Sequence, residues 1–402
     1  MIRAFGLTGV AFLAFVSLGL PDGVLGVAWP SMSGALGLGL GELGGLLVMA
    51  MVGYLVSAVA SGTLVARIGV GGLLLVSSVV MVASSLGYAL APNRAVALVA
   101  ALLAGLGGGA IDAGVNAYAA RRFPARQVTW LHACYGIGAT LGPLLITAVM
   151  TSGRSWRLGY VALAIALGAM TLAFARTRSA WDTPASGEDA RAIADSPGAT
   201  LGEALGRVPV WLNSALFFVY TGLEVTAGQW MFSVFTETRG IDVGAAGLAV
   251  SAYWASLTLG RVAFGALAAH HAPVRLLRVS LIICPAAALA IWWAPQPLIG
   301  FAALAALGFT FGPIYPLLVT LTPERVGRRY VTQAVSVQVA LAYLGTAALP
   351  GAAGVLAVMF GLVIIPAFLV GGTVLLALVY QLAACARQGG LAPAHRAPAP
   401  QR

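Results

Sequence analysis

Apolar residues dominate the chain in long runs, and each run ends at Gly, Pro or charged residues. A helix needs about 20 apolar residues to cross a bilayer, and every run reaches that length. The pattern therefore predicts twelve membrane-spanning helices. They are expected at 4–29, 43–66, 70–91, 95–120, 129–151, 157–177, 210–237, 243–269, 274–294, 297–321, 329–357 and 359–385.

One long polar stretch interrupts this pattern and contains five of the twelve acids. It divides the chain into two halves with six predicted helices each. We expect a six-helix bundle over 1–177, a cytoplasmic linker over 178–209 and a second six-helix bundle over 210–386. The remaining residues, 387–402, are rich in Pro, Ala and Gly, which predicts a disordered cytoplasmic tail.

The two halves also resemble each other in sequence. ALLAGLG at 101–107 is matched by AALAALG at 302–308, and Asp22 in the first span is matched by Glu224 in the seventh. Paired repeats around a site at the bilayer midplane are an architecture of secondary transporters. The expected fold is therefore all-α and integral to the membrane, with twelve transmembrane helices in two pseudo-symmetric six-helix bundles.

The composition agrees with a membrane protein and excludes other classes. Hydrophobic residues make up 60% of the 402 positions and charged residues only 8%, against about 25% charged residues in soluble domains. A soluble enzyme, a nucleic-acid-binding protein and a disulfide scaffold are excluded as descriptions of the whole chain. The three Cys are widely spaced, so we expect no disulfide framework, metal or cofactor.

The basic residues predict how the chain is oriented. The net charge of +10 comes with 22 basic residues, all of them Arg. With both termini in the cytoplasm, 18 of these Arg fall on the cytoplasmic side and four outside, which is the asymmetry that orients membrane proteins. Arg261 is counted with the cytoplasmic group. Arg-only usage with abundant Ala and Gly is typical of a bacterial chain, so we expect a monomer in the bacterial cytoplasmic (inner) membrane.

Three acids lie inside predicted spans: Asp22 in the first, Asp112 in the fourth and Glu224 in the seventh. An acid at the centre of a membrane helix costs about 2.5–3.5 kcal/mol on the insertion scale, so such acids usually serve a function. No Arg is expected at the same depth. These carboxylates are therefore favoured as proton carriers. In a two-repeat transporter they would lie on cavity-lining spans, as would the tenth span, which is broken near Gly312 and Pro313.

Each acid also has a purely structural interpretation. Asp22 lies between Pro21 and Gly23 and can cap a helix break. The other two acids can bond to neighbours on their own helices. Those neighbours are Asn116 for Asp112, and Thr221 or Gln229 for Glu224.

Polar and aromatic side chains near the acids are candidates for contacting a solute. Amides and carboxylates bond to hydroxyl-rich ligands, while aromatic rings stack on the apolar faces of sugars. The candidates are Asn116, Tyr118, Tyr220, Gln229, Trp230, Tyr315, Gln338 and Tyr343. His132 can respond to pH, but its place at the start of the fifth span favours the cytoplasmic interface.

Six stretches spread over both halves carry a resemblance to a known family. They read GLPDGVLGVAWPSM, GAIDAGVNAYAARRF, LHACYGIGATLGP, YTGLEVTAGQW, YWASLTLGR and GPIYPLLVTLTPERVG. With these stretches the chain resembles the major facilitator superfamily, and within it the fucose-permease-like branch of proton-coupled sugar symporters.

The resemblance implies roles for two of the acids. In that branch, acids on the first and fourth spans are associated with sugar recognition and proton coupling, and they correspond to Asp22 and Asp112. Asp112 stands where the fucose permease has Glu, and Glu224 is an additional acid. The superfamily's loop motif after the second span normally carries an Asp where this chain has Ala66 before Arg67, so a gating contact is expected to be missing.

The sequence therefore predicts a secondary transporter that moves a small polar solute, expected to be a monosaccharide, with protons by alternating access. Asp22, Asp112 and Glu224 are the expected proton-coupling residues. The expected solute contacts are Asp22, Asn116, Tyr220, Gln229, Trp230, Tyr315 and Gln338. Export of an amphipathic or cationic compound, coupling to sodium, and a non-transporting membrane sensor remain alternatives.

Overall fold

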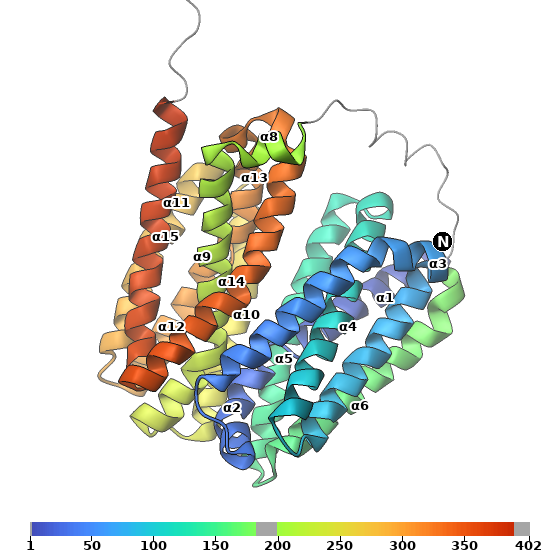
Figure 1. The fold of residues 1–402 in the computed structure, drawn as a ribbon, viewed down its shortest axis with the longest axis vertical. Coiled ribbons are helices and arrows are strands. Elements are labelled where there is room, and N and C mark those ends of the chain that lie inside the picture. Colours follow the sequence, from blue (N-terminus) through green and yellow to red (C-terminus); the bar gives the residue numbers. More distant parts are fainter. Residues whose placement is uncertain (1, 182–198, 390–402) are drawn as a thin grey trace, which may run out of the picture.

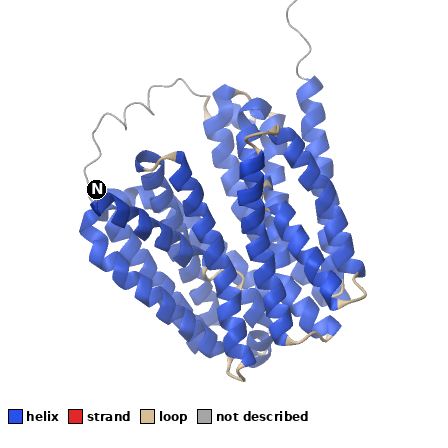
Figure 2. Cartoon of the chain, turned by 180° about the vertical axis from the view of Figure 1, so that it is seen from behind, coloured by secondary structure: helices blue, strands red, loops and turns tan. Residues whose placement is uncertain are grey.

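The computed structural model describes residues 2–181 and 199–389, and within these ranges every regular element is helical (Figure 2). The central part of the predicted linker, 182–198, lies outside the described residues. The predicted tail also lies outside the described residues from 390 onward. Its first three residues belong to the last helix, which ends at Gly389 rather than at the predicted boundary of 386.

The helices of the first half follow the apolar runs closely. They are α1 (Ile2–Gly19), α2 (Val24–Leu36), α3 (Glu42–Leu90), α4 (Arg94–Arg122), α5 (Ala125–Thr151), α6 (Trp156–Thr177) and the 3₁₀ turn η1 (Arg178–Ala180).

The second half repeats this organisation after a short helix at the end of the predicted linker. Its elements are α8 (Leu201–Leu205), α9 (Val208–Ser233), the π-helical η2 (Val234–Thr238), α10 (Val243–Leu267), α11 (Pro273–Trp293), α12 (Pro297–Phe311), α13 (Ile314–Val326), the 3₁₀ turn η3 (Arg328–Tyr330), α14 (Val331–Phe360) and α15 (Ile364–Gly389).

Eleven segments of the described residues are long and apolar enough to cross a membrane, and one of them, α3, has 49 residues. At 1.5 Å per residue a continuous helix of this length would measure about 73 Å, more than twice the thickness of a bilayer core. Gly69 divides α3, because its backbone angles (φ 70°, ψ 170°) are not helical. The count therefore agrees with twelve crossings, since the second and third are two helices that meet at Gly69 without a loop.

Two spans are broken where Pro and Gly interrupt the apolar pattern. The first span bends between α1 and α2, where Gly23 adopts a left-handed conformation (φ 72°). The tenth bends between α12 and α13, at Gly312 and Pro313. Pro lacks the N–H that a continuous helix requires, and Gly tolerates the left-handed backbone. The predicted break in the tenth span is confirmed.

Large apolar side chains cover the outside of the molecule. Val59, Ile165 and Leu382 are among many that remain exposed, while the aromatic core lies between helices. A soluble monomer rarely exposes so much contiguous apolar surface. The exposed faces are therefore expected to contact lipid.

The two halves form two helical bundles that meet at one end and diverge at the other (Figure 1). We call the end that contains α2 and the start of α3 the joined end. The opposite end is the splayed end, where the N-terminus and the last turn of α15 lie (Figure 1).

Glycines allow the bundles to touch at the joined end. A Cβ on Gly44 of α3 would lie 2.9 Å from Gly351 Cα of α14. One on Gly26 of α2 would lie 2.6 Å from the carbonyl oxygen of Gln229 on α9. Such distances are shorter than van der Waals contact, so these pairs of helices pack backbone to backbone.

We expect Gly26→Ala to shift the population away from this closed joined end, because its methyl group would collide with backbone. Spin labels on Arg154→Cys and Gln296→Cys, both exposed in loops at the joined end, would report a larger share of long distances. Gly34→Ala on the same helix is the control, since nothing lies within 4 Å of its Cβ. Identical distance distributions for the two variants would contradict the role of Gly26.

Candidate functional site

Asp22 lies in the break of the first span, between α1 and α2, and is partly exposed. The Tyr135 hydroxyl on α5 donates a hydrogen bond to Asp22 Oδ2. Among the described residues, Tyr135 is the only side chain that forms a hydrogen bond with this carboxylate. The N-cap residue of α2 is Gly23 and not Asp22. The structure therefore directs Asp22 toward α5 rather than toward the amides of the helix break.

Asp112 on α4 accepts hydrogen bonds from three helices. Asn116 Nδ2 donates to Oδ1 over 2.8 Å, which confirms the neighbour expected one turn away. The Tyr54 hydroxyl of α3 donates to Oδ2. Tyr343 of α14 donates to the Tyr54 oxygen and lies 3.3 Å from the same Oδ2. All three partners are neutral, and one of them belongs to the other bundle.

Glu224 on α9 has a cation partner that the sequence interpretation missed. Arg261 Nη2 lies 3.4 Å from Glu224 Oε1, and the two side chains are only 26% and 11% exposed. The Tyr220 hydroxyl donates to the other carboxylate oxygen. The alternative bond to Thr221 is not formed, since the Thr221 hydroxyl donates to the Ala342 carbonyl instead.

The placement of Arg261 corrects the prediction that no Arg lies at the depth of the acids. It falls six residues before the end of α10 (Val243–Leu267), about 9 Å inside the helix. Its Nε atom is buried and has no hydrogen-bond partner among the described residues. Arg261 was assigned to the cytoplasmic side because a single Arg near the end of an apolar run is compatible with either position.

Two of the three acids, Asp22 and Glu224, face each other across the bundle boundary. Asp22 and Glu224, from different bundles, are close enough to repel. His132 on α5 interacts electrostatically with both Asp112 and Arg261, and its ring packs edge-on against Phe15 at 5.3 Å. His132 is exposed and within electrostatic reach of Asp112, a neighbour that its expected place at the membrane interface did not predict.

Two expected solute contacts are already engaged in packing. Trp230 is fully buried, and its indole N–H donates to the Pro350 carbonyl over 3.0 Å. Tyr220 is also fully buried against Glu224. Either ring would need to be uncovered before it could touch a solute.

Three other expected contacts are less fully engaged in packing. Gln229 and Gln338 are buried, and each has one amide atom without a partner among the described residues. Tyr315, which follows the break of the tenth span, is partly exposed. Its ring packs edge-on against Phe217 at 5.0 Å.

Trp254 of α10 packs between Gly23 of the first span and Gly228 of α9. The sequence interpretation did not single it out. A Cβ on Gly23 would lie 2.6 Å from Trp254 Nε1, and one on Gly228 would lie 2.5 Å from Cζ2. The ring therefore fills the space between the broken first span and α9. Trp254 and Tyr135 both lie in stretches that carry the family resemblance, and this was the available signal.

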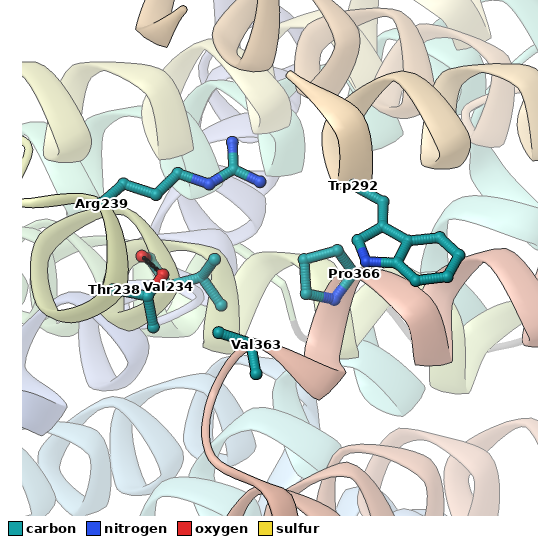
Figure 3. Close-up of a pocket in the computed structure, with 6 residues that line it drawn as sticks. All are labelled: Val234, Thr238, Arg239, Trp292, Val363 and Pro366. Atoms are coloured by element: carbon teal, nitrogen blue, oxygen red, sulfur yellow. Dashed lines mark hydrogen bonds between the residues drawn. The ribbon is translucent and has the colours of Figure 1, made fainter. Parts of the chain in front are cut away.

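A pocket of about 250 Å³ lies away from the acids, at the joined end of the second bundle (Figure 3). Figure 3 shows Arg239 of the α9–α10 connection and Trp292 of α11 on opposite sides of the pocket, with Pro366 of α15 between them in this view. Arg239 Nη2 donates to the Ile291 carbonyl over 2.5 Å. This bond satisfies one of the free carbonyls in the last turn of α11, so Arg239 has a structural role there.

Within residues 2–181 and 199–389, no three His, Cys, Asp or Glu side chains gather as a metal site would require. The chemistry available at the bundle boundary is that of three carboxylates, one guanidinium, one imidazole and several phenols. Such a set can bind protons and hydroxyl-bearing or charged solutes.

Comparison with protein families gives one match, which covers residues 11–350 and is described as the Major Facilitator Superfamily. Among curated proteins, the chain is similar to Bypass of stop codon protein 6 of Saccharomyces cerevisiae. The two are 23% identical over 388 residues, which are 88% of this chain and 77% of the yeast protein.

Solved structures share the fold at low sequence identity. A D-xylose-proton symporter has a TM-score of 0.73 and 15% identity, and covers 93% of this chain and 97% of its own. A bacterial homolog of the human lysosomal transporter Spinster, inward-facing and unoccupied, has 0.73 and 13%, with 97% and 98% covered. The transporter FucP in the outward conformation has 0.63 and 15%, with 94% and 98% covered.

Proposed function

Because this chain belongs to the Major Facilitator Superfamily, we propose that it is a secondary active transporter coupling protons to a small polar solute, with a monosaccharide as the leading candidate. The observation that carries the proposal is the set of three carboxylates at the bundle boundary. Asp22 and Asp112 are bonded to neutral tyrosines, and a carboxyl group with neutral partners can exchange a proton without leaving an unpaired cation behind.

Proton coupling is assigned to Asp22, Asp112 and Glu224. A charged carboxylate moving through the low-dielectric membrane carries a large desolvation cost, and protonation removes that cost. Glu224 differs from the other two because Arg261 lies beside it. Its protonation would free the guanidinium, and an acceptor on the solute would then be a favourable partner.

A hydroxyl-rich solute suits the groups that remain unsatisfied. Among the described residues, the buried Arg261 Nε lacks an acceptor, as does the Gln338 amide nitrogen, and Gln229 Oε1 lacks a donor. Sugar hydroxyls supply both functions. Tyr315 is the proposed stacking ring, and Asn116, Tyr220 and Trp230 are the further proposed contacts, of which the last two require rearrangement.

Alternating access would move the bundle 1–177 against the bundle 210–386 around the three acids. We further propose that both termini lie in the cytoplasm of a bacterium, with the chain in the inner membrane, on the strength of the Arg asymmetry. In that orientation the joined end is the outer end. The conformation described here would then be open toward the cytoplasm.

The test is transport by the purified protein in liposomes that contain a pH-sensitive dye, with a panel of sugars added outside. Proton-coupled import predicts that one sugar acidifies the lumen and that its radiolabelled form enters. Glu42→Gln is a matched control, since Glu42 is bonded to Arg94 on the surface over 2.7 Å, about three turns of α3 before Tyr54. A sugar that enters without any pH change would contradict the coupling, and absence of entry for all sugars would contradict the solute class.

A second candidate is export of an amphipathic or cationic compound. The charge balance favours it, because the region holds three acids and one Arg, and that Arg is paired with Glu224. It predicts that a drug-sensitive host gains resistance from the protein and loses it when Glu224 is neutralised.

Sodium coupling, in place of protons, predicts that transport depends on sodium at a fixed pH.

A further inference from the structure

Within the described part of the chain, Asp112 is the one of the three acids whose hydrogen-bonded group extends from one bundle to the other. Tyr343 reaches it from α14 of the second bundle, while Tyr54 comes from α3 and Asn116 from its own helix in the first. The rings of Tyr54 and Tyr343 are also in contact, with centroids 4.0 Å apart. The carboxylate, the two phenols and the two helices therefore form one bridge across the boundary.

This bridge joins the same two helices that touch at the joined end. Tyr54 lies ten residues after Gly44 on α3, and Tyr343 lies eight residues before Gly351 on α14. At 1.5 Å per residue, the bridge is about 12–15 Å from the glycine contact. Moving α14 away from α3 at the joined end also displaces the bridge. Hydrogen bonds weaken steeply with a shift of about 1 Å, so the bridge opposes that movement.

The strength of the bridge depends on the charge of Asp112. An ionised carboxylate accepts all the donors that point at it, and hydrogen bonds to a charged acceptor are roughly twice as strong as neutral ones. A protonated carboxyl carries no charge and uses one oxygen as a donor. Protonation therefore weakens the tie between the bundles.

We infer that Tyr54 and Tyr343 are positioning residues that link the proton on Asp112 to the closure of the joined end. With Asp112 ionised, the tyrosine bridge stabilises the closed joined end, and with Asp112 protonated the bundles can separate there. This inference rests on the proposed alternating movement, but it requires neither the proposed solute nor the proposed coupling ion.

Other titratable groups also face Asp112 and must be separated from its effect. His132 on α5 and Tyr315 on α13 interact with it electrostatically. His132 gains charge when the pH falls, in the same direction as Asp112. The variant His132→Gln is therefore part of the design, and it is expected to keep the pH response.

The experiment measures distances between spin labels on Arg154→Cys and Gln296→Cys at the joined end, with Cys134, Cys284 and Cys385 replaced by Ala. The purified chain in nanodiscs is examined across pH without any solute, so the result is independent of transport activity. The share of long distances is expected to increase as the pH falls. Tyr343→Phe should raise that share by roughly tenfold at high pH, since the bridge loses the hydrogen bond that joins α14 to Tyr54 and Asp112, and should flatten its pH dependence.

Tyr160→Phe is the matched control, because the Tyr160 hydroxyl is buried in the first bundle without a hydrogen-bond partner among the described residues. It should behave as the parent does. Asp112→Asn should resemble Tyr343→Phe, and combining the two should add little, because both remove the same interaction.

Two results would overturn the inference. One is a parent-like distance distribution and pH response in Tyr343→Phe, or in Tyr54→Phe if the first variant does not fold. The other is a pH response that persists in Asp112→Asn and disappears in His132→Gln, which would assign the titration to the imidazole.

Discussion

Asp112→Asn is expected to abolish accumulation of the solute against its gradient while leaving solute exchange intact. The amide has nearly the shape of the carboxyl group but binds no proton. A pH difference of about 2 units sustains a solute ratio of about 100 with one coupled proton, because each unit is tenfold in proton activity. We expect the ratio in proteoliposomes to fall to about one, with counterflow of labelled solute retained.

The surface variant Glu42→Gln makes the same chemical change about three turns of α3 before Tyr54, away from the three acids, and should accumulate solute normally. Loss of both accumulation and counterflow in Asp112→Asn would indicate a binding defect rather than uncoupling. Normal accumulation in Asp112→Asn would remove this residue from the coupling mechanism.

The largest effect on stability is expected from Arg261→Met, which keeps much of the side-chain volume and removes the charge. Glu224 is then left without its cation in a site where its side chain is only 11% exposed. Breaking a buried ion pair by removing one partner costs about 3–5 kcal/mol. Thermal unfolding in detergent, followed by tryptophan fluorescence, should show a clearly lower Tm.

The double variant Arg261→Met/Glu224→Gln should recover most of this loss, because no uncompensated charge remains. Lowering the pH should likewise reduce the deficit of the single variant, since a protonated Glu224 carries no charge. A double variant as unstable as Arg261→Met would show that the guanidinium contributes through packing and not through the ion pair.

The features predicted from sequence are those that depend on neighbouring residues. The long apolar runs fix the spans, and the Gly and Pro at 312–313 break the tenth one. Asn116 was found as a partner of Asp112 because residues four apart on a helix share a face. The same local reasoning placed Asp22 in a helix break, though it did not reveal the contact with α5.

The features that were missed depend on how distant helices pack. Tyr54 and Tyr135 meet the acids across 58 and 113 residues of sequence, and no periodicity within one span points to such partners. Arg261 was misplaced for a related reason. Its charge is tolerated inside the membrane because Glu224 of another helix lies beside it, and hydropathy along one helix carries no information about that neighbour.

At the joined end the bundles touch at glycines, which have no side-chain torsion angles. A Leu at each contact would lose about 0.5–1 kcal/mol of rotamer freedom whenever the bundles closed. Gly26, Gly44 and Gly351 lose none, so closure at these points changes little conformational entropy. The two arrangements of the bundles can therefore be close in free energy, and a single ligand with a few kcal/mol of preference is enough to shift the population from one to the other.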